Sequence, residues 1–338
     1  MQSSKTYPCA GLSSRLQGAA RKTALAIGLV LLATGAAAQA KFPSRAVTLV
    51  VGFPPGGSND IVARIIAPKF SEALGVPVIV ENKAGANATI GTEYTVRAKP
   101  DGYTVTLGSA SPLAISPHTY KNLPYDPLTD LRAVTTVAQT PELLAINPKV
   151  PARTLAELVK LSKTRNVTLA SSGAGGLPHL AIELFRLESG GHIVHVPYKG
   201  AAPAITDAVG GHVDGIIVDV PALYSQVQAG KLRPVAVTHE KRSSVLPKVP
   251  TSAEGGLPKL LAFNWFAVMA PAKTPDGVVD TLYAALAKAA KDPQVIAQLG
   301  KLGIEPYIQA SPAAAEAFMK SETLRWGKIA KAADVRAN

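Results

Sequence analysis

Short runs of apolar residues alternate along this chain with stretches in which apolar residues recur every three or four positions. The short runs, which are typical of buried strands, cover residues 47–53, 76–80, 103–107, 167–170, 193–196 and 215–218. Helical spacing begins at about Asp60, and Thr154 with Glu157 forms a capping box ahead of another helix. Later helices are expected to begin at three prolines, Pro275, Pro293 and Pro312. This alternation predicts an α/β fold of mostly parallel sheets covered by helices.

The first forty residues follow a different pattern, that of a secretory signal peptide. Arg21 and Lys22 precede an apolar stretch of 11 residues, 24–34, which is short beside the roughly 20 residues of a membrane-spanning helix. Small residues then lead to Ala38-Gln39-Ala40, which resembles an A-x-A cleavage site. We therefore expect residues 1–40 to be removed on export to the periplasm. An uncleaved N-terminal anchor is the alternative.

Cysteine and charge narrow the class of protein further. The only cysteine, Cys9, lies upstream of the apolar stretch, so the mature chain would carry no disulfide, no thiol nucleophile and no thiolate metal site. The predicted signal contains four basic residues and no acidic ones, so its removal lowers the net charge from +12 to +8. Such an excess favours anionic ligands. Because the basic residues are scattered and aromatic residues make up 5% of the chain, we expect no nucleic-acid partner.

Two parts of the chain contain the same arrangement: a predicted strand, then a glycine-rich turn, then the start of a predicted helix. The first turn covers residues 54–60 and the second covers residues 171–179. Glycines allow a ligand to approach the backbone closely, and a helix start supplies N–H donors and a partial positive charge. Each turn is therefore a candidate anion site, and two such turns could hold a carboxylate from both sides. A tight loop without a ligand is the alternative for either turn alone.

The usual motifs of nucleotide, metal and cofactor sites do not occur. The chain has no G-x-x-x-x-G-K-[ST], no H-E-x-x-H and, near Gly173, no G-x-G-x-x-G spacing. Its six histidines show no ligand spacing, and His192 and His195 have no acidic neighbour in sequence. We expect no cofactor and no metal. Trp265 and Trp326 lie in apolar surroundings and are expected to pack in the core.

A series of short motifs then places the chain beside a known family. In order these are Phe42-Pro43-Ser44-Arg45, Gly56-Gly57-Ser58-Asn59-Asp60, Val80-Glu81-Asn82-Lys83, Pro100-Asp101-Gly102-Tyr103-Thr104, Leu123-Pro124-Tyr125-Asp126-Pro127, Ser171-Ser172-Gly173, Val196-Pro197-Tyr198-Lys199-Gly200, Gly210-Gly211-His212-Val213-Asp214 and Leu246-Pro247-Lys248-Val249-Pro250-Thr251. With them the chain resembles the Bug family, the substrate-binding proteins of tripartite tricarboxylate transporters. The resemblance runs from about Phe42 to Ala333.

The resemblance implies a type II periplasmic-binding-protein fold, with two lobes joined by crossing strands and the ligand between them. It implies that lobe one comprises residues 41–141 and 233–338 and that lobe two comprises residues 142–232. It implies that the ligand meets one side formed by Phe53, Pro54, Gly56, Gly57, Ser58 and Asp60. Facing these would be Gly173, Gly175 and Gly176, with His179 behind them as a turn-stabilising residue. Ser109 and Tyr198 would close the pocket, and Asp219 would face the cleft, where it could bind a cationic group or simply hold a turn.

The expected function is capture of a small carboxylate or amino acid by a monomer, which delivers it to membrane permease subunits. A receptor that signals to a membrane sensor kinase is an alternative that the sequence leaves open. A serine hydrolase using Ser58, Asp60 and His179 is the remote alternative, because no G-x-S-x-G elbow occurs. We expect no catalysis. For Asp60, a helix-capping role paired with Arg64, one turn on, is favoured over ligand contact, since a carboxylate repels an anion.

Overall fold

The computed structural model describes residues 2–6 and 42–337. The chain divides into two units, Met1–Ser44 and Arg45–Asn338, and the helices and strands described below belong to the second. Apart from residues 2–6, the predicted signal segment, residues 1–40, lies outside the described residues. No helix in the described part of the chain is long and apolar enough to cross a membrane.

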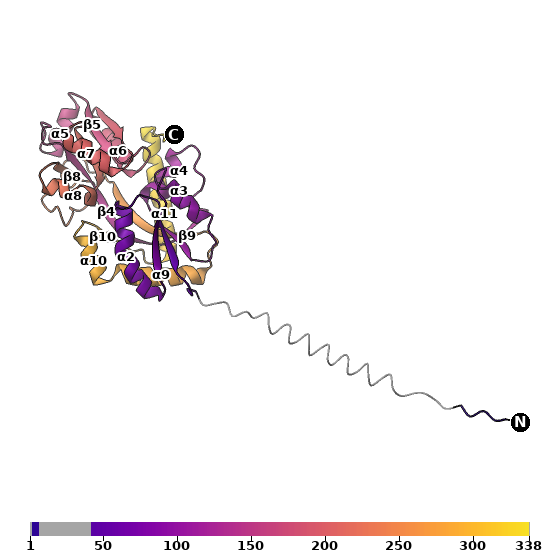
Figure 1. Cartoon of the computed structure of the whole chain (residues 1–338). Helices are drawn as coiled ribbons and strands as arrows, with labels where there is room; N and C mark the ends of the chain where they lie inside the picture. The colour runs from indigo at the N-terminus through magenta and orange to yellow at the C-terminus, as the bar shows by residue number, and fades with distance from the viewer. Residues whose placement is uncertain (1, 7–41, 338) are drawn as a thin grey trace. The chain divides into compact units, whose positions relative to one another are not determined.

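The first sheet combines parallel strands at one edge with antiparallel strands beside them. Its order is β2-β1-β3-β9-β4, with β10 also paired to β4. The strands are β1 (Val47–Val51), β2 (Val78–Asn82), β3 (Thr104–Ser109), β4 (Leu131–Ile146), β9 (Phe263–Pro271) and β10 (Glu305–Pro306). The α-helices around it, labelled in Figure 1, are α2 (Ser58–Leu74), α3 (Thr89–Val96), α4 (Ser116–Thr119), α9 (Asp276–Ala290), α10 (Pro293–Gly300) and α11 (Pro312–Ala333). A π-helical turn, η1 (Ser111–Ile115), precedes α4. We call this group of elements lobe one.

The second sheet repeats the arrangement with a shorter stretch of chain. Parallel strands lie in the order β7-β5-β6, and the end of β4 pairs antiparallel with β7 and with β8. The strands are β5 (Val167–Ser171), β6 (Ile193–Pro197), β7 (Gly215–Asp219) and β8 (Arg233–Val237). The accompanying helices, which Figure 1 shows beside these strands, are α5 (Leu155–Ser162), α6 (Leu177–Ser189), α7 (Ala201–Gly210) and α8 (Val220–Gln228). We call this group lobe two. The predicted α/β class is confirmed.

The 16-residue strand β4 belongs to both sheets. Residues Leu131 to Pro141 pair with β9, and residues Glu142 to Ile146 pair with β7. The chain returns to lobe one through the segment after β8, where Thr238 donates its backbone N–H to Glu142 O at 3.0 Å. The expected lobe boundary at residues 141 and 142 falls where β4 changes partners. Strand β8, which was expected in lobe one, pairs within the second sheet, and the full division into lobes stays a prediction.

The short apolar runs form strands, although their ends shift by one or two residues. Strand β2 begins at Val78 instead of Val76, and β3 ends at Ser109 instead of Leu107. The capping box is confirmed, because Glu157 N–H donates to Thr154 Oγ1 at 3.2 Å. Helices α10 and α11 begin at the expected prolines, Pro293 and Pro312, and α9 begins one residue after Pro275. Strands β4, β8, β9 and β10 were not predicted.

Trp265 and Trp326 pack in the core of lobe one, as predicted. Both are fully buried, and both indole Nε1 atoms donate to Glu322 Oε2, at 3.0 and 3.1 Å. The Glu322 carboxylate, on α11, thus satisfies two buried donors and fastens the last long helix to β9. Helix α11 also contacts α6 of lobe two.

Candidate ligand-binding site

The first glycine-rich turn joins β1 to α2 and is exposed. Gly56 has a positive φ of 86°, and Gly57 is the N-cap residue of α2 in an extended conformation. Pro54, Gly56 and Gly57 are exposed and Phe53 and Ser58 are half-buried. The turn therefore presents backbone groups and the start of a 17-residue helix to the solvent, as an anion site requires.

Asp60 supports this turn from below. Its carboxylate, only 3% exposed, accepts hydrogen bonds from Gly56 N–H at 2.9 Å, from Asn82 Nδ2 at 2.9 Å and from Arg64 Nε at 2.9 Å. Asn82 also donates to Phe53 O at 3.1 Å. Burial by itself raises the pKa of Asp60, but the bonds from Arg64, Gly56 and Asn82 leave that pKa below its ordinary value. The expected pairing with Arg64 is confirmed. The expected capping of the helix is not, because the N–H bonded by Asp60 belongs to Gly56, which precedes the N-cap residue Gly57; the carboxylate instead holds the turn.

The second turn joins β5 to α6 and is held by two stacked histidines. His179 Nδ1 accepts Gly175 N–H at 3.0 Å, so the predicted turn-stabilising role of His179 is confirmed. The His195 ring stacks on that of His179 with centroids 3.7 Å apart, and its Nε2 lies 2.6 Å from Ser171 Oγ. Burial lowers the pKa of His179, and burial followed by repulsion from His179 lowers the pKa of His195 to about 3. Both rings are therefore neutral at neutral pH.

The second turn also contacts lobe one. Thr119 Oγ1 of α4 donates to Gly175 O at 3.0 Å, and Leu177 N–H at the start of α6 donates to Ser111 Oγ of η1 at 3.0 Å. Gly175 has φ 71°, and a Cβ there would lie 2.4 Å from Ala337 Cβ. A glycine is thus needed at 175 for both its backbone conformation and this close approach. These bonds join the two lobes beside the predicted site.

Gly176 lies against a loop of lobe one that the sequence did not single out. A Cβ at Gly176 would lie 3.0 Å from Asn87 Nδ2. Asn87 belongs to three consecutive non-glycine residues with positive φ: Ala86 at 45°, Asn87 at 52° and Ala88 at 70°. Such a run is uncommon for residues other than glycine. Asn87 lies close to Gly176 of the second turn, and Ala88 packs on Gly52 at the end of β1. The loop therefore lies between the two glycine-rich turns.

A hydrogen-bonded chain connects the end of β3 in lobe one to the end of β7 in lobe two. Ala110 N–H, just after Ser109 at the end of β3, donates to Asn264 Oδ1 at 3.4 Å, and Asn264 Nδ2 donates to Asp219 Oδ2 at 3.1 Å. Ser109 is buried, whereas Asp219, at the end of β7, is half-buried. Since β1 and β3 are parallel, as are β5 and β7, the predicted residues gather at the carboxyl ends of parallel strands, where α/β proteins commonly bind ligands.

Tyr198 lies beside the second turn, with its backbone N–H donating to Ser171 O at 3.1 Å. Its hydroxyl donates to Asp207 Oδ2 at 2.6 Å, and this bond, with burial, raises the pKa of Tyr198 to about 12. The hydroxyl is thus engaged within lobe two, and the neutral phenol helps to fix the segment that follows β6.

The remote hydrolase arrangement is not assembled in the described residues. Asp60 bonds to Gly56, Asn82 and Arg64, while His179 bonds to Gly175, and no described contact joins Ser58 to either side chain. A serine nucleophile needs a histidine within hydrogen-bond reach. Among the described residues, no group of three or more histidine, cysteine or acidic side chains is placed to hold a metal ion.

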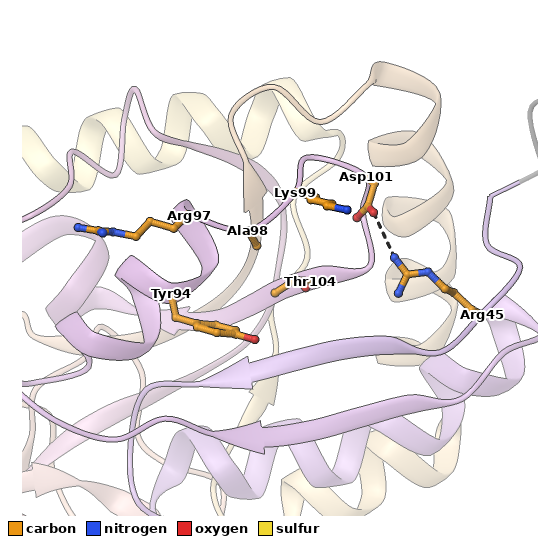
Figure 2. A pocket seen from close by; sticks show the side chains of 7 residues that line it. All are labelled: Arg45, Tyr94, Arg97, Ala98, Lys99, Asp101 and Thr104. Atoms are coloured by element: carbon orange, nitrogen blue, oxygen red, sulfur yellow. Dashed lines mark hydrogen bonds and ion pairs between the residues drawn. The ribbon is translucent and has the colours of Figure 1, made fainter.

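A pocket of about 300 Å³ lies at the opposite, amino ends of β1 and β3 (Figure 2). Its lining includes Arg45, Arg97 and Lys99. Arg45 pairs with Asp101 at 3.1 Å and stacks over Tyr103 with 3.8 Å from the guanidinium carbon to the ring centroid. The pocket is therefore separate from the two glycine-rich turns. The Arg45 guanidinium is already bonded to Asp101 and stacked on Tyr103.

A family model described as "Tripartite tricarboxylate transporter family receptor" matches residues 62–335. The chain belongs to this receptor family. It is 37% identical to the protein BugT of Bordetella pertussis over 311 residues, which cover 90% of this chain and 95% of BugT. The resemblance inferred from the motifs is thereby confirmed.

Two solved structures extend the comparison to ligand-bound proteins. Rpa4515 of R. palustris with adipate has a TM-score of 0.82 at 35% identity and covers 87% of this chain and 99% of its own. MatC (Rpa3494) from Rhodopseudomonas palustris with bound malate has a TM-score of 0.76 at 28% identity, over 85% and 99%. The two-lobed periplasmic-binding-protein fold is confirmed. Members of this family are periplasmic receptors, and membership supports a solute-binding role.

Proposed function

We propose that this protein captures a small carboxylate between its β1–α2 and β5–α6 turns and delivers it to a membrane permease. The observation that carries this proposal is the pairing of two glycine-rich helix starts at the carboxyl ends of parallel strands, one in each lobe. Each helix start supplies N–H donors and a partial positive charge that suit an anion. Relatives of similar fold bind the carboxylates adipate and malate.

In the proposed mechanism the lobes close on the ligand. The hydrogen bonds from Thr119 to Gly175 and from Leu177 to Ser111 join the lobes at the second turn, and opening would break them. A ligand shifts the clamp toward the closed state only as far as it binds that state more tightly. The permease would then recognise the closed pair of lobes.

Thermal unfolding against a panel of mono-, di- and tricarboxylates and amino acids tests capture, using protein that has been unfolded and refolded to remove bound ligand. A ligand at a hundred times its dissociation constant adds about 2.7 kcal/mol of stability. This should raise the midpoint by several degrees. A flat response to every acid on the panel would contradict carboxylate capture.

Substitutions at two glycines then locate the site. A Cβ at Gly57 would lie no closer than 3.7 Å to a neighbour, and one at Gly173 no closer than 3.8 Å, and neither glycine has a positive φ. Gly57→Val and Gly173→Val should therefore fold normally and lose the ligand-induced shift. Gly277→Val, where nothing lies within 4 Å, is the control. Retention of the full shift in both test variants would place the site elsewhere.

Delivery is tested by uptake in cells. Deleting the gene should abolish uptake of the labelled ligand at a concentration below its dissociation constant. A plasmid copy of the natural gene should restore uptake, whereas a Gly57→Val copy should not. Uptake that is unchanged by the deletion would argue against delivery while leaving capture intact.

A further inference from the structure

One end of lobe two is formed by the amino ends of its parallel strands and the carboxyl end of β4. Ile146, the last residue of β4, pairs with the first residues of β7 and β8, Gly215 and Arg233, and β5 and β6 begin beside each other at this same end. The connecting segments that meet there are residues 147–166, 190–192, 211–214 and 229–233. The five-residue strand β5, roughly 16 Å long, separates them from the β5–α6 turn of the candidate site.

These four segments bring together positive charge that is scattered in the sequence. They contain two acidic residues, Glu157 and Asp214, and seven basic ones: Lys149, Arg153, Lys160, Lys163, Arg165, Lys231 and Arg233. Their net charge of +5 is more than half of the +8 expected for the mature chain. We call this surface the basic end of lobe two.

Most of the charge at the basic end is not neutralised by ion pairs. Asp214 pairs with Arg165 at 2.8 Å, and Glu157 Oε2 accepts the backbone N–H of Arg153 at 2.5 Å. Within the described part of the chain, four exposed side chains have no hydrogen-bond or ion-pair partner for their charged groups: Lys149, Arg153, Lys160 and Lys231. These cations are therefore available to an external anion.

A pocket of about 520 Å³ lies in this surface. Its lining includes Lys149, Arg153 and Arg233, with Glu157 as its one acidic residue. Arg233 is fixed in position because its guanidinium donates to Ala152 O at 2.8 Å, an acceptor that carries no net charge. The three cations therefore leave the pocket positive. Arginine and lysine side chains in such a setting are typical ligands of phosphate groups.

The basic end presents charge to the solvent and keeps its apolar side chains inside. The buried apolar residues of the four segments include Val150, Leu155, Leu158 and Leu232, and the segments contain no Phe, Tyr or Trp. A protein interface is built around an apolar core rich in aromatic residues, and single-stranded nucleic acids stack on aromatic side chains. Separate exposed cations instead suit phosphate groups arrayed on a surface, as on an anionic bilayer.

We propose that the basic end of lobe two binds the phosphate headgroups of an anionic phospholipid bilayer, with one headgroup phosphate in the pocket between Lys149, Arg153 and Arg233. Attraction of this kind requires no inserted apolar side chain and weakens as salt screens the charges. The β5–α6 turn lies at the other end of lobe two, so the receptor can hold a ligand while it rests on the membrane. The inference goes beyond capture and delivery, because the partner is the bilayer itself.

Vesicle flotation tests the proposal with protein that begins at Lys41, which keeps every described helix and strand and leaves out the apolar predicted signal. The natural sequence should float with vesicles of phosphatidylglycerol and phosphatidylcholine in equal parts and should not float with vesicles of phosphatidylcholine alone. Flotation should disappear at about 1 M salt, where the screening length is about 3 Å. No binding to the anionic vesicles at low salt would overturn the proposal.

Matched double variants locate the contact. Lys149→Gln with Arg153→Gln should weaken vesicle binding about thirtyfold, since each basic residue near an anionic surface contributes about 1 kcal/mol. Lys288→Gln with Lys320→Gln removes two exposed charges from α9 and α11 of lobe one and should leave binding nearly unchanged. Circular dichroism checks that each variant is folded. Equal losses in the two variants would mean a diffuse attraction by net charge and would overturn the proposed site.

Calorimetry with inorganic phosphate separates the two sources of a phosphate group. Vesicle binding without measurable binding of free phosphate supports the bilayer as the partner. Binding of free phosphate that is lost in Lys149→Gln with Arg153→Gln, without any binding to vesicles, would assign the pocket to a soluble phosphate compound and overturn the membrane partner. Neither experiment uses a carboxylate or a permease, so a failure of the proposed function would leave these outcomes unaffected.

Discussion

Asp60 illustrates how a single side chain can shape a site without entering it. Its carboxylate accepts hydrogen bonds from Gly56 in the turn, from Arg64 on α2 and from Asn82 on β2. These bonds fix the backbone of residues 53–57. The role of Asp60 beside Arg64 could be predicted, because both lie on one helix four residues apart. The contribution of Asn82 could not, because it comes from a separate strand, and only the parallel pairing of β1 with β2 brings it close.

Replacing Asp60 should destabilise the protein and loosen the first turn. Asp60→Asn leaves Arg64 without a charged acceptor, so we expect the free energy of unfolding to fall by about 1–3 kcal/mol. Because the pKa of Asp60 is lowered in the folded protein, its contribution is present above the ordinary value of 3.8 and disappears as the pH falls through the lowered value. Urea unfolding at pH 7 and at pH 3 measures both effects. Asp280 is exposed on α9 and serves as the control; an equal loss at pH 7 in Asp280→Asn would contradict this account.

At the scale of an element, the stacked histidines make the β5–α6 turn sensitive to acid. The pKa of His195 is about 3 in the folded protein and ordinarily 6.5. Between these values the unfolded chain binds more protons than the folded one, so stability should fall as the pH decreases from about 6.5. His195→Gln should show a smaller fall between pH 7 and pH 5 in urea unfolding. The exposed His192 supplies the control, and His192→Gln should behave as the natural protein.

Glu322 should be indispensable for anchoring α11. Glu322→Leu would leave the indole N–H groups of Trp265 and Trp326 buried without an acceptor, at a cost of about 2–4 kcal/mol. Chemical denaturation followed by tryptophan fluorescence measures this loss directly. Glu316→Leu, on the same helix, is the matched substitution and should cost far less. A similar cost for both would mean that the two indoles do not depend on this acceptor.

The elements that the sequence did not predict are those held by distant partners. Strand β4 interrupts its apolar residues with buried Thr135, Thr136 and Thr140, so it shows neither a continuous apolar run nor a strict alternation. It pairs with β9, more than a hundred residues further along the chain. Strands β1, β5 and β7, by contrast, are short apolar runs followed by recognisable turns, and their local pattern was sufficient.

At the scale of the whole molecule, the contacts between the lobes allow the clamp to be locked. A Cβ at Gly176 would lie 3.2 Å from Ser111 Oγ, which is within the reach of a disulfide, and the only natural cysteine is Cys9. We expect the variant Ser111→Cys with Gly176→Cys to lose ligand exchange when oxidised and to regain it on reduction. Calorimetry with and without reductant measures this, with Ser111→Cys alone as the control. Unchanged exchange in the oxidised variant would show that these surfaces need not separate.

The two strand–turn–helix arrangements, β1–α2 and β5–α6, could be predicted from the sequence, because a short apolar run precedes each glycine-rich turn and helical spacing follows it. The engagement of the second turn with Ser111, Thr119 and Asn87 could not, because it depends on how the lobes meet and no local pattern encodes that. The charge at the basic end of lobe two escaped notice for a related reason. Its basic residues come from segments far apart in sequence, and only the pairing of the strands brings those segments together.

The route of the chain through the two sheets also sets the order in which they can form during synthesis. The second sheet is complete once residues 142–237 have emerged, whereas the first combines strands from residues 47–141 with β9 and β10, at residues 263–306. Strands β3 and β4 of lobe one therefore stay unpaired with β9 until residues 263–271 have been synthesised. Pairings between strands far apart in sequence also form slowly. A nascent chain stalled before β9 would leave the edge of β3 unpaired, and an unpaired strand edge is a template for pairing with other chains.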